Sequence, residues 1–168
     1  MSSASGTSSL PPLVSPSDGS PLSASATAPL LSGRRVALYF SAGWCPMCTS
    51  FEPDLHAFLT DAATAARPAA LIYVGSDRSA EESLRRAREL GCVAAVRHGA
   101  DAAAVKRRFE VWAGSERGEL GHGRRSGVPA LVVLDASGEE LAFVAAEADG
   151  AHALDTWPLD DVRGIWGA

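Results

Sequence analysis

The chain has 168 residues, of which 46% are apolar and 21% charged, and its formal net charge is −5. This composition is typical of a globular protein, and the length suits one hydrophobic core rather than several domains. Arginines are mixed with acidic residues instead of forming a basic face, and no run of about eighteen apolar residues occurs, so we expect neither a nucleic-acid partner nor a membrane span.

The cysteine content and the N-terminus point to a reducing compartment. Three cysteines are too few for a disulfide-built secreted scaffold, and their odd number leaves a thiol unpaired. The first residues lack the basic and apolar regions of a secretory signal. We therefore expect a cytoplasmic protein, with the nucleus left open, and organelle import also left open because the N-terminus is rich in serine and poor in acids.

The N-terminal region divides into two parts. Residues 1–9, MSSASGTSS, bury too little apolar surface to repay the entropy of ordering, so we expect a flexible tail before a single domain over residues 10–168. From Leu10 to Ser23, apolar residues flank the turn-forming stretch Ser17 to Ser20. Composition alone fits either a short hairpin at a sheet edge or a proline- and serine-rich linker.

The next segments alternate between strand and helix patterns. Val36 to Phe40 predicts a buried strand, and the helix after it carries an apolar face made of Phe51, Leu55, Phe58, Leu59 and Ala62. Pro53 lies inside this helix and predicts a kink near Thr49 to Ser50, because proline removes a backbone donor and crowds the preceding turn.

A second strand and helix follow the same order. Ala70 to Val74 predicts a buried strand, and Ser79 with Glu82 forms a capping-box pattern that opens a helix closed by Gly91. Strand, helix and strand in this order imply a parallel sheet with right-handed crossovers.

The last third of the chain predicts a short strand at residues 92–96, a helix at residues 101–109 capped by Asp101, and a hairpin at residues 128–146. Between the helix and the hairpin, residues 111–127 contain five glycines and no steady period. We expect a long loop there, and loops of this length in compact domains tend to be functional or mobile.

The stretch YFSAGWCPMCTSFEP places Cys45 and Cys48 just after a strand and at the start of a helix. The unpaired backbone donors of a helix start favour the thiolate of Cys45, and Pro46 suits the first helical position. Cys48 lies most of a turn further on, close enough to form a disulfide with Cys45 and shielded enough to remain a thiol. The pattern favours a redox pair.

Two other interpretations of the pair are a metal site and a purely structural pair. A structural zinc site needs four ligands, usually from two close pairs, but only Cys92 remains besides four histidines that occur singly: His56, His98, His122 and His152. Two buried cysteines without chemistry rarely come together with this Trp, Pro and strand-to-helix setting.

Three motifs, in this order, resemble the tryparedoxin and nucleoredoxin branch of the thioredoxin-like superfamily: VALYFSAGWCPMCTSFEPDLHAF, LIYVGSDRSAEE and GVPALVVLDASGEEL. The resemblance implies a thioredoxin-like α/β fold, with a central mixed β-sheet flanked by helices and an N-terminal β-hairpin extension. It therefore favours the hairpin over the linker for Leu10 to Ser23. It also implies that Trp157 and Pro158 pack near the C-terminus.

The resemblance also implies site residues. Cys45 would be the nucleophile and Cys48 the resolving thiol, with Trp44, Pro46 and Met47 flanking them. Pro129 would be the family's cis-proline facing the cysteines, and Val128 would offer its backbone to an extended substrate. Apart from the redox-active Cys45–Cys48 disulfide, no cofactor or metal is implied.

The implied activity is reduction of protein disulfides, with electrons from an upstream reductase or a low-molecular-weight dithiol, by a chain that we expect to be a monomer. The alternative is a non-catalytic adaptor that binds partners through the cis-proline face and keeps the pair for regulation. A thiol peroxidase is disfavoured because its Pro-x-x-x-Thr-x-x-Cys arrangement is lacking.

Four departures from the branch bear on the site. Met47 replaces a second proline, Thr49 replaces a common arginine, and Tyr39 stands where thioredoxins carry a buried carboxylate, so no proton acceptor for Cys48 is identified. The fourth is the glycine-rich insertion, which brings Arg124 and Arg125 towards the site, either to stabilise a thiolate and steer a partner or as a solvated surface pair.

Two further residues have open roles. Asp77 could accept a proton behind the cysteines or only cap the turn at Ser79. Cys92 fits a small buried hydrophobe better than a regulatory thiol.

Overall fold

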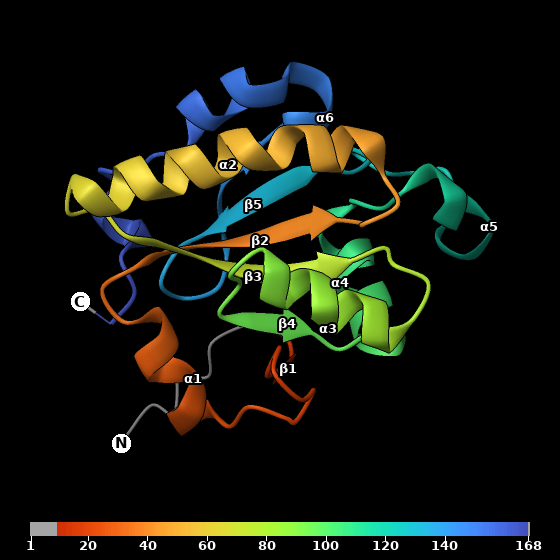
Figure 1. Ribbon diagram of the computed structural model, residues 1–168, viewed down its shortest axis with the longest axis horizontal. Coiled ribbons are helices and arrows are strands. Elements are labelled where there is room, and N and C mark those ends of the chain that lie inside the picture. The colour runs from red at the N-terminus through yellow and green to blue at the C-terminus, as the bar shows by residue number, and fades with distance from the viewer. Residues whose placement is uncertain (1–9, 168) are drawn as a thin grey trace.

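A central mixed sheet organises the computed structural model, which describes residues 10–167. The tail predicted at residues 1–9 lies outside the described residues. Within them the strand order is β1-β4-β3-β2-β5-β6 (Figure 1). The strands are β1 (Leu13–Val14), β2 (Arg35–Ser41), β3 (Ala69–Gly75), β4 (Ala94–Val96), β5 (Ala130–Leu134) and β6 (Glu140–Val144).

The sheet combines a parallel centre with antiparallel edges. β2, β3 and β4 run parallel, while β5 pairs antiparallel with β2, β6 with β5, and β1 with β4. Each predicted strand is present, and the hairpin predicted at residues 128–146 is formed by β5 and β6.

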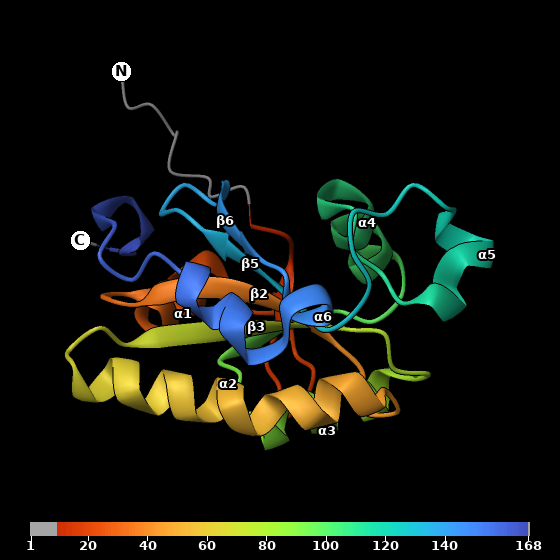
Figure 2. The ribbon, with the colours of Figure 1, turned by 90° about the horizontal axis from the view of Figure 1, so that it is seen from above.

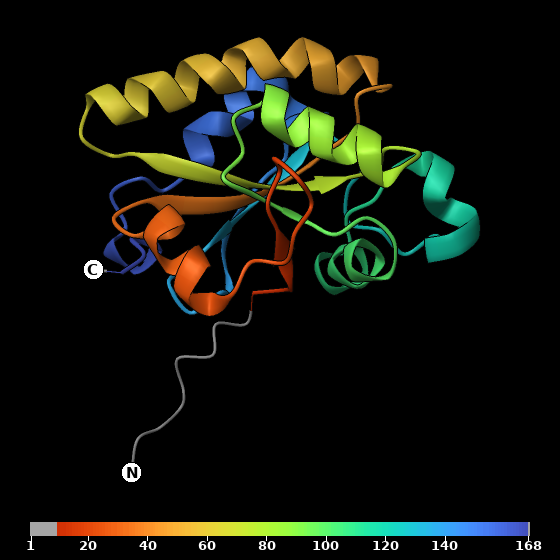
Figure 3. The same cartoon turned by 60° about the horizontal axis from the view of Figure 1, so that its bottom comes forward.

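Helices cover both faces of the sheet, as Figures 2 and 3 show. They are α1 (Ala24–Leu31), α2 (Pro46–Thr64), α3 (Ala80–Glu89), α4 (Ala100–Phe109), α5 (Arg117–Leu120) and α6 (Ala146–Asp149). One apolar core packs α1 and α4 on the sheet, and a second packs α2, α3 and α6 on the opposite face. The predicted α/β architecture is confirmed. None of the helices in residues 10–167 is long and apolar enough to cross a membrane.

The N-terminal hairpin is short and leads into a helix that the sequence pattern did not predict. Val14 pairs with Ala95 of β4 on one side and forms a single bridge to Pro21 on the other. The second strand of the hairpin ends soon after this bridge, because α1 begins at Ala24. The Ser23 hydroxyl caps the helix by accepting a hydrogen bond from the amide of Ala26. The helix sequence ASATAPLL contains a proline and no regular polar face, so its periodicity gave no signal.

The start of α4 differs from the prediction. Gly99, with φ of +105°, is the N-cap, and no side chain caps this end. Asp101 lies instead inside the first turn, where a negative charge is favourable beside the free amides, and its carboxylate is 3.9 Å from Arg97.

Helix α3 begins with half of the predicted capping box. The Ser79 hydroxyl accepts a hydrogen bond from the amide of Glu82, but the Glu82 carboxylate accepts one from the amide of Arg78 rather than from Ser79. The helix therefore starts where predicted, but the Glu82 carboxylate binds the amide of the residue before the N-cap.

Helix α2 confirms the predicted apolar face and runs without a break through Pro53. Phe51, Leu55 and Ala62 are buried, and Phe58 packs on Trp157 with ring centroids 5.5 Å apart. This contact brings the predicted aromatic segment near the C-terminus onto the helix. The kink near Thr49 to Ser50 stays a prediction.

The glycine-rich segment at residues 111–127 is not an irregular loop. It contains a 3-10 turn at Gly114–Glu116 and helix α5, and Trp112 is buried. The Glu116 carboxylate fixes it to the body of the molecule, because it accepts hydrogen bonds from Ser76 at 2.5 Å and from Lys106 at 2.6 Å. Glycine content suggested mobility, but these buried polar contacts hold the segment.

Candidate active site

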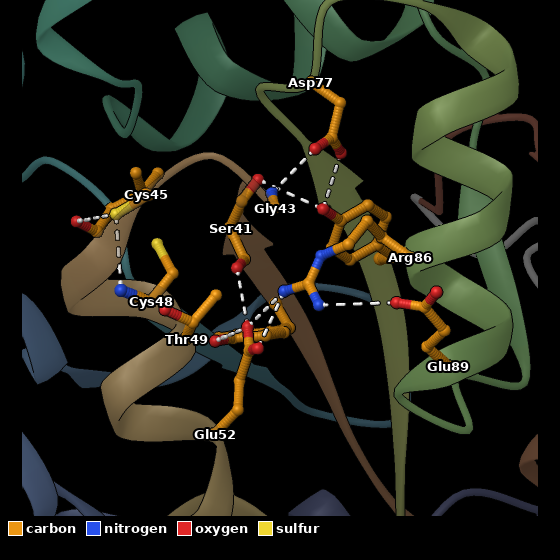
Figure 4. Close-up of polar contacts among 12 residues, drawn as sticks. Ser41, Gly43, Cys45, Cys48, Thr49, Glu52, Asp77, Arg86 and Glu89 are labelled. Atoms are coloured by element: carbon orange, nitrogen blue, oxygen red, sulfur yellow. Dashed lines mark hydrogen bonds and ion pairs between the residues drawn. The ribbon is translucent and has the colours of Figure 1, made fainter.

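Cys45 and Cys48 lie where β2 ends and α2 begins (Figure 4). Cys45 is the N-cap of α2, and its sulfur accepts a hydrogen bond from the Cys48 amide at 3.3 Å. The Cys45 thiol also points to the Val128 carbonyl at 3.9 Å. All three cysteines of the chain are free and buried.

The two thiols differ in exposure. Cys45 is 7% exposed and Cys48 is completely buried. Burial, together with the neighbouring Cys45, raises the pKa of the Cys48 thiol to about 12. Cys48 therefore stays protonated near neutral pH.

A buried carboxylate holds the loop before the cysteines. Asp77 is 7% exposed, and its two oxygens accept hydrogen bonds from the Gly43 amide at 2.8 Å and from the Tyr73 hydroxyl at 2.6 Å. The Ser79 hydroxyl itself caps the start of α3, and the role of Asp77 as a proton acceptor stays a prediction. Asp77 is a loop anchor.

The residues around Cys45 form a partly apolar surface. Trp44 is 40% exposed and Met47 is 52% exposed, while the Trp44 indole donates a hydrogen bond to the Ser76 carbonyl at 2.9 Å. That bond fixes the ring beside the cysteine, and the exposed Pro46 continues the same surface. The predicted flanking residues are thus brought together at the site.

The segment before β5 faces Cys45. The peptide bond between Val128 and Pro129 is cis. The amide of Gly127, just before it, donates a hydrogen bond to the Glu147 carboxylate at 3.0 Å. Glu147 was not among the predicted site residues, since no sequence pattern around it links it to this loop.

Arg124 and Arg125 both make contacts within the glycine-rich segment and its surroundings. Arg124 donates to the Trp112 carbonyl. Arg125 binds both oxygens of Glu140, donates to the Phe109 carbonyl and lies 4.0 Å from the centroid of the Phe143 ring. These contacts tie residues 111–127 to the body of the molecule, and the thiolate-stabilising and steering roles stay predictions.

The site also contains a buried ion pair that sequence analysis did not find. Glu52, one helical turn after Cys48, accepts hydrogen bonds from the hydroxyls of Tyr39 and Ser41, at 2.9 and 3.0 Å. Arg86 reaches the same carboxylate at 2.6 Å. Residues 39 and 41 share one face of β2, and residues 48 and 52 share one face of α2. The strand period of two and the helix spacing of four were therefore the sequence signal that could have revealed this cluster.

The ion pair explains the glycine in the active-site loop. A Cβ atom added at Gly43 would lie 2.8 Å from Cδ of Arg86, whose side chain passes beneath the loop to reach Glu52. Any larger residue at this position would push the arginine aside. Glycine at position 43 thus permits the close approach of loop and ion pair.

Metal ligation was the second interpretation of the cysteine pair. Within residues 10–167, no cluster of three or more His, Cys, Asp or Glu side chains is suitable for holding a metal ion.

Cys92 provides a test of pH dependence. Burial raises the pKa of its thiol from the ordinary value of 9.0 to about 12. Between these values the unfolded chain loses the proton while the folded protein retains it, so the free energy of unfolding falls as pH rises. Urea unfolding of the reduced protein should show that the free energy of unfolding falls between about pH 8 and about pH 10. Cys92 should contribute about 1 kcal/mol of this fall.

The matched variant is Cys92→Ala. It should show a smaller loss of stability over the same pH interval, since the titrating thiol is gone. An equal loss in both proteins would contradict the assignment.

Comparison with known proteins agrees with this geometry. Residues 33–140 match the family described as thioredoxin-like. The probable nucleoredoxin 1 of Arabidopsis thaliana is 26% identical over 133 residues, which are 79% of this chain and 21% of that protein. The chain thus spans about a fifth of the length of this curated relative.

Solved structures show the same fold. Thioredoxin from Wuchereria bancrofti matches with a TM-score of 0.57 and 24% identity, covering 87% of this chain and 85% of that one. Tryparedoxin II from C. fasciculata matches with a TM-score of 0.56 and 21% identity, covering 79% and 76%. The chain therefore belongs to the thioredoxin-like family, and nucleoredoxin and tryparedoxin are among the proteins that it resembles.

Proposed function

We propose that this chain is a thiol-disulfide oxidoreductase that reduces disulfides of other proteins. The observation that carries the proposal is the free pair itself, with Cys45 at the helix N-cap and Cys48 buried one turn behind it. A helix start stabilises the thiolate that must attack, and burial preserves the thiol that must wait.

The exchange has two steps. The Cys45 thiolate attacks one sulfur of a target disulfide, forms a mixed disulfide and releases the other sulfur as a thiolate. Cys48 then loses its proton and attacks the Cys45 sulfur, which releases the second target thiolate and leaves a Cys45–Cys48 disulfide. Two electrons pass from the pair to the target.

Target binding would use the surface around Cys45. The Val128 carbonyl lies 3.9 Å from the Cys45 sulfur, and this segment precedes the paired strand β5. An extended target can pair its backbone with Val128 beside Pro129, while the exposed Trp44 and Met47 contact its apolar side chains.

The oxidised pair must be returned to the dithiol. We propose that a reductase or a low-molecular-weight dithiol supplies the electrons, and a tryparedoxin II that resembles this chain has been solved in complex with glutathionylspermidine. The proposal requires no metal or organic cofactor and assigns the activity to a monomer in a reducing compartment, the cytoplasm.

Insulin reduction tests the proposal. With dithiothreitol as electron donor, the wild-type protein is expected to accelerate the turbidity that follows cleavage of the insulin disulfides, and Cys45→Ser to remove the acceleration. Cys92→Ser is the matched control and should leave the rate unchanged, since Cys92 is buried outside the site. A wild-type rate equal to the rate without protein would reject the proposed oxidoreductase activity and favour the non-catalytic adaptor.

A further inference from the structure

The glycine-rich segment at residues 111–127 contains a small pocket at the active-site end of the molecule. Helix α5, which belongs to this segment, lies at the same end as the start of α2, where Cys45 is placed (Figures 1 and 2). The pocket has a volume of about 180 Å³. Among the described residues that line it, three are basic and none is acidic. The lining residues are Trp112, Gly114, Arg117, Gly121, His122 and Arg124.

Hydrogen bonds within the segment hold the pocket in shape. The Trp112 indole donates to the Gly121 carbonyl at 3.2 Å, and Arg124 donates to the Trp112 carbonyl at 2.9 Å. The Gly121 amide donates to the Arg117 carbonyl at 2.8 Å, and the Arg117 amide donates to the Gly114 carbonyl. These carbonyl oxygens therefore already accept hydrogen bonds, so the polar groups that remain for a ligand are mainly donors.

Two arginines of the pocket have no counter-charge. Within residues 10–167, neither Arg117 nor Arg124 forms an ion pair, whereas the neighbouring Arg125 binds both oxygens of Glu140. Arg117 and Arg124 are both exposed. A guanidinium is planar and always charged, and its N–H donors match the geometry of a carboxylate. The pocket is therefore suited to a small anionic group, such as the carboxylate that aspartate and glutamate carry.

The pocket adjoins the segment that faces Cys45. A Cβ atom added at Gly127 would lie 2.6 Å from a guanidinium nitrogen of Arg124. Gly127 is followed by Val128, whose carbonyl lies 3.9 Å from the Cys45 sulfur. The Glu147 carboxylate also lies beside Gly127 and accepts a hydrogen bond from its amide, but it does not line the pocket. A chain extended along Val128 therefore brings a residue close to its own cysteine within reach of Arg124.

We propose that this pocket binds a carboxylate of the target protein and so selects disulfides that have an acidic residue close to the attacked cysteine. The inference rests on the proposed function and names its substrate class. Arg117 and Arg124 bind the carboxylate by charge-assisted hydrogen bonds while the Cys45 thiolate attacks the disulfide. Successive residues of an extended chain are about 3.3 Å apart, so the acidic residue lies within about three positions of the cysteine, on one side of it.

Symmetric peptide disulfides test the inference. Each consists of two identical copies of a peptide joined through its single cysteine, so that attack on either sulfur is equivalent. One series carries a single aspartate at successive positions before and after the cysteine, and the paired series carries asparagine at the same positions. The rate at which each peptide disulfide oxidises the reduced protein is measured by alkylation of the remaining thiols and mass spectrometry of the intact protein.

On one side of the cysteine, the aspartate peptide is expected to react about tenfold or more faster than its asparagine counterpart, the factor that one hydrogen bond to a charged group provides. Arg117→Gln and Arg124→Gln should each lower this ratio, and the double variant should abolish it by slowing only the aspartate peptide. Arg34→Gln is the matched control. It removes one positive charge at the opposite end of β2 from the cysteines and should leave the ratio unchanged.

Three results would overturn the inference while leaving the exchange intact. The first is equal rates for aspartate and asparagine peptides at every position. The second is equal slowing of both peptides by Arg117→Gln, whose side chain forms no ion pair within residues 10–167, because this would mean a structural effect on the segment. The third is the same loss of preference in Arg34→Gln, which would mean attraction by net charge. If no peptide oxidises wild type faster than Cys45→Ser, the proposed function itself fails.

Discussion

Replacement of Cys48 by serine is expected to stop turnover after one chemical step and to leave the target attached to Cys45. The serine hydroxyl cannot attack the mixed disulfide at neutral pH, because its proton is far less acidic than that of a thiol. Cys45 keeps its N-cap position, and the backbone amide that donates to its sulfur at 3.3 Å belongs to residue 48 whatever the side chain. The nucleophile therefore survives the change.

Mass spectrometry of the intact protein without reductant provides the measurement. After incubation with a protein disulfide, Cys48→Ser should carry one target chain that dithiothreitol removes, and wild type should carry almost none. Cys45→Ser is the matched control, since Cys48 is buried and should form no adduct. Adducts on Cys45→Ser that equal those on Cys48→Ser would contradict the assignment of Cys45 as the attacking thiol.

The same variant identifies partners. Target proteins that remain attached to Cys48→Ser in a cell extract, and are absent from the doubly substituted Cys45→Ser, Cys48→Ser protein, are those that Cys45 attacks. Their identity would show which class of protein disulfides the chain reduces, because the geometry around Val128 selects no particular target sequence.

The sequence was most informative where a pattern repeats along the chain. Val36 to Phe40 and Ala70 to Val74 are continuous apolar runs, and each forms the buried part of a central strand. The α/β fold and the resemblance to tryparedoxin and nucleoredoxin, which rest on motifs of this kind, are confirmed. Helix α1 was missed because a short helix rich in alanine and serine has no apolar period to detect.

The site was less predictable because its polar contacts cross between elements. Asp77 accepts a hydrogen bond from a loop amide 34 residues earlier in the chain. Glu116 fixes a glycine-rich segment whose composition predicts mobility. Arg86 is one of several arginines on α3, and only the tertiary fold brings it to Glu52. Contacts at this sequence separation leave no local pattern.

Breaking the Glu52–Arg86 pair from one side is expected to have the largest effect on stability. The two side chains are only 10% and 12% exposed, so removal of either leaves an almost buried charge without its partner. Loss of one member of a buried pair typically costs about 3 to 5 kcal/mol. Glu52→Leu strands the Arg86 cation and also removes the acceptor of the Tyr39 and Ser41 hydroxyls.

Removal of both charges should cost much less than removal of one. In the double variant Glu52→Leu, Arg86→Met neither charge has to be desolvated, and two apolar side chains fill the space, so we expect a loss of about 1 to 2 kcal/mol. Urea unfolding followed by tryptophan fluorescence measures all four proteins of the cycle. Additive losses in the double variant would show that the two charges act independently.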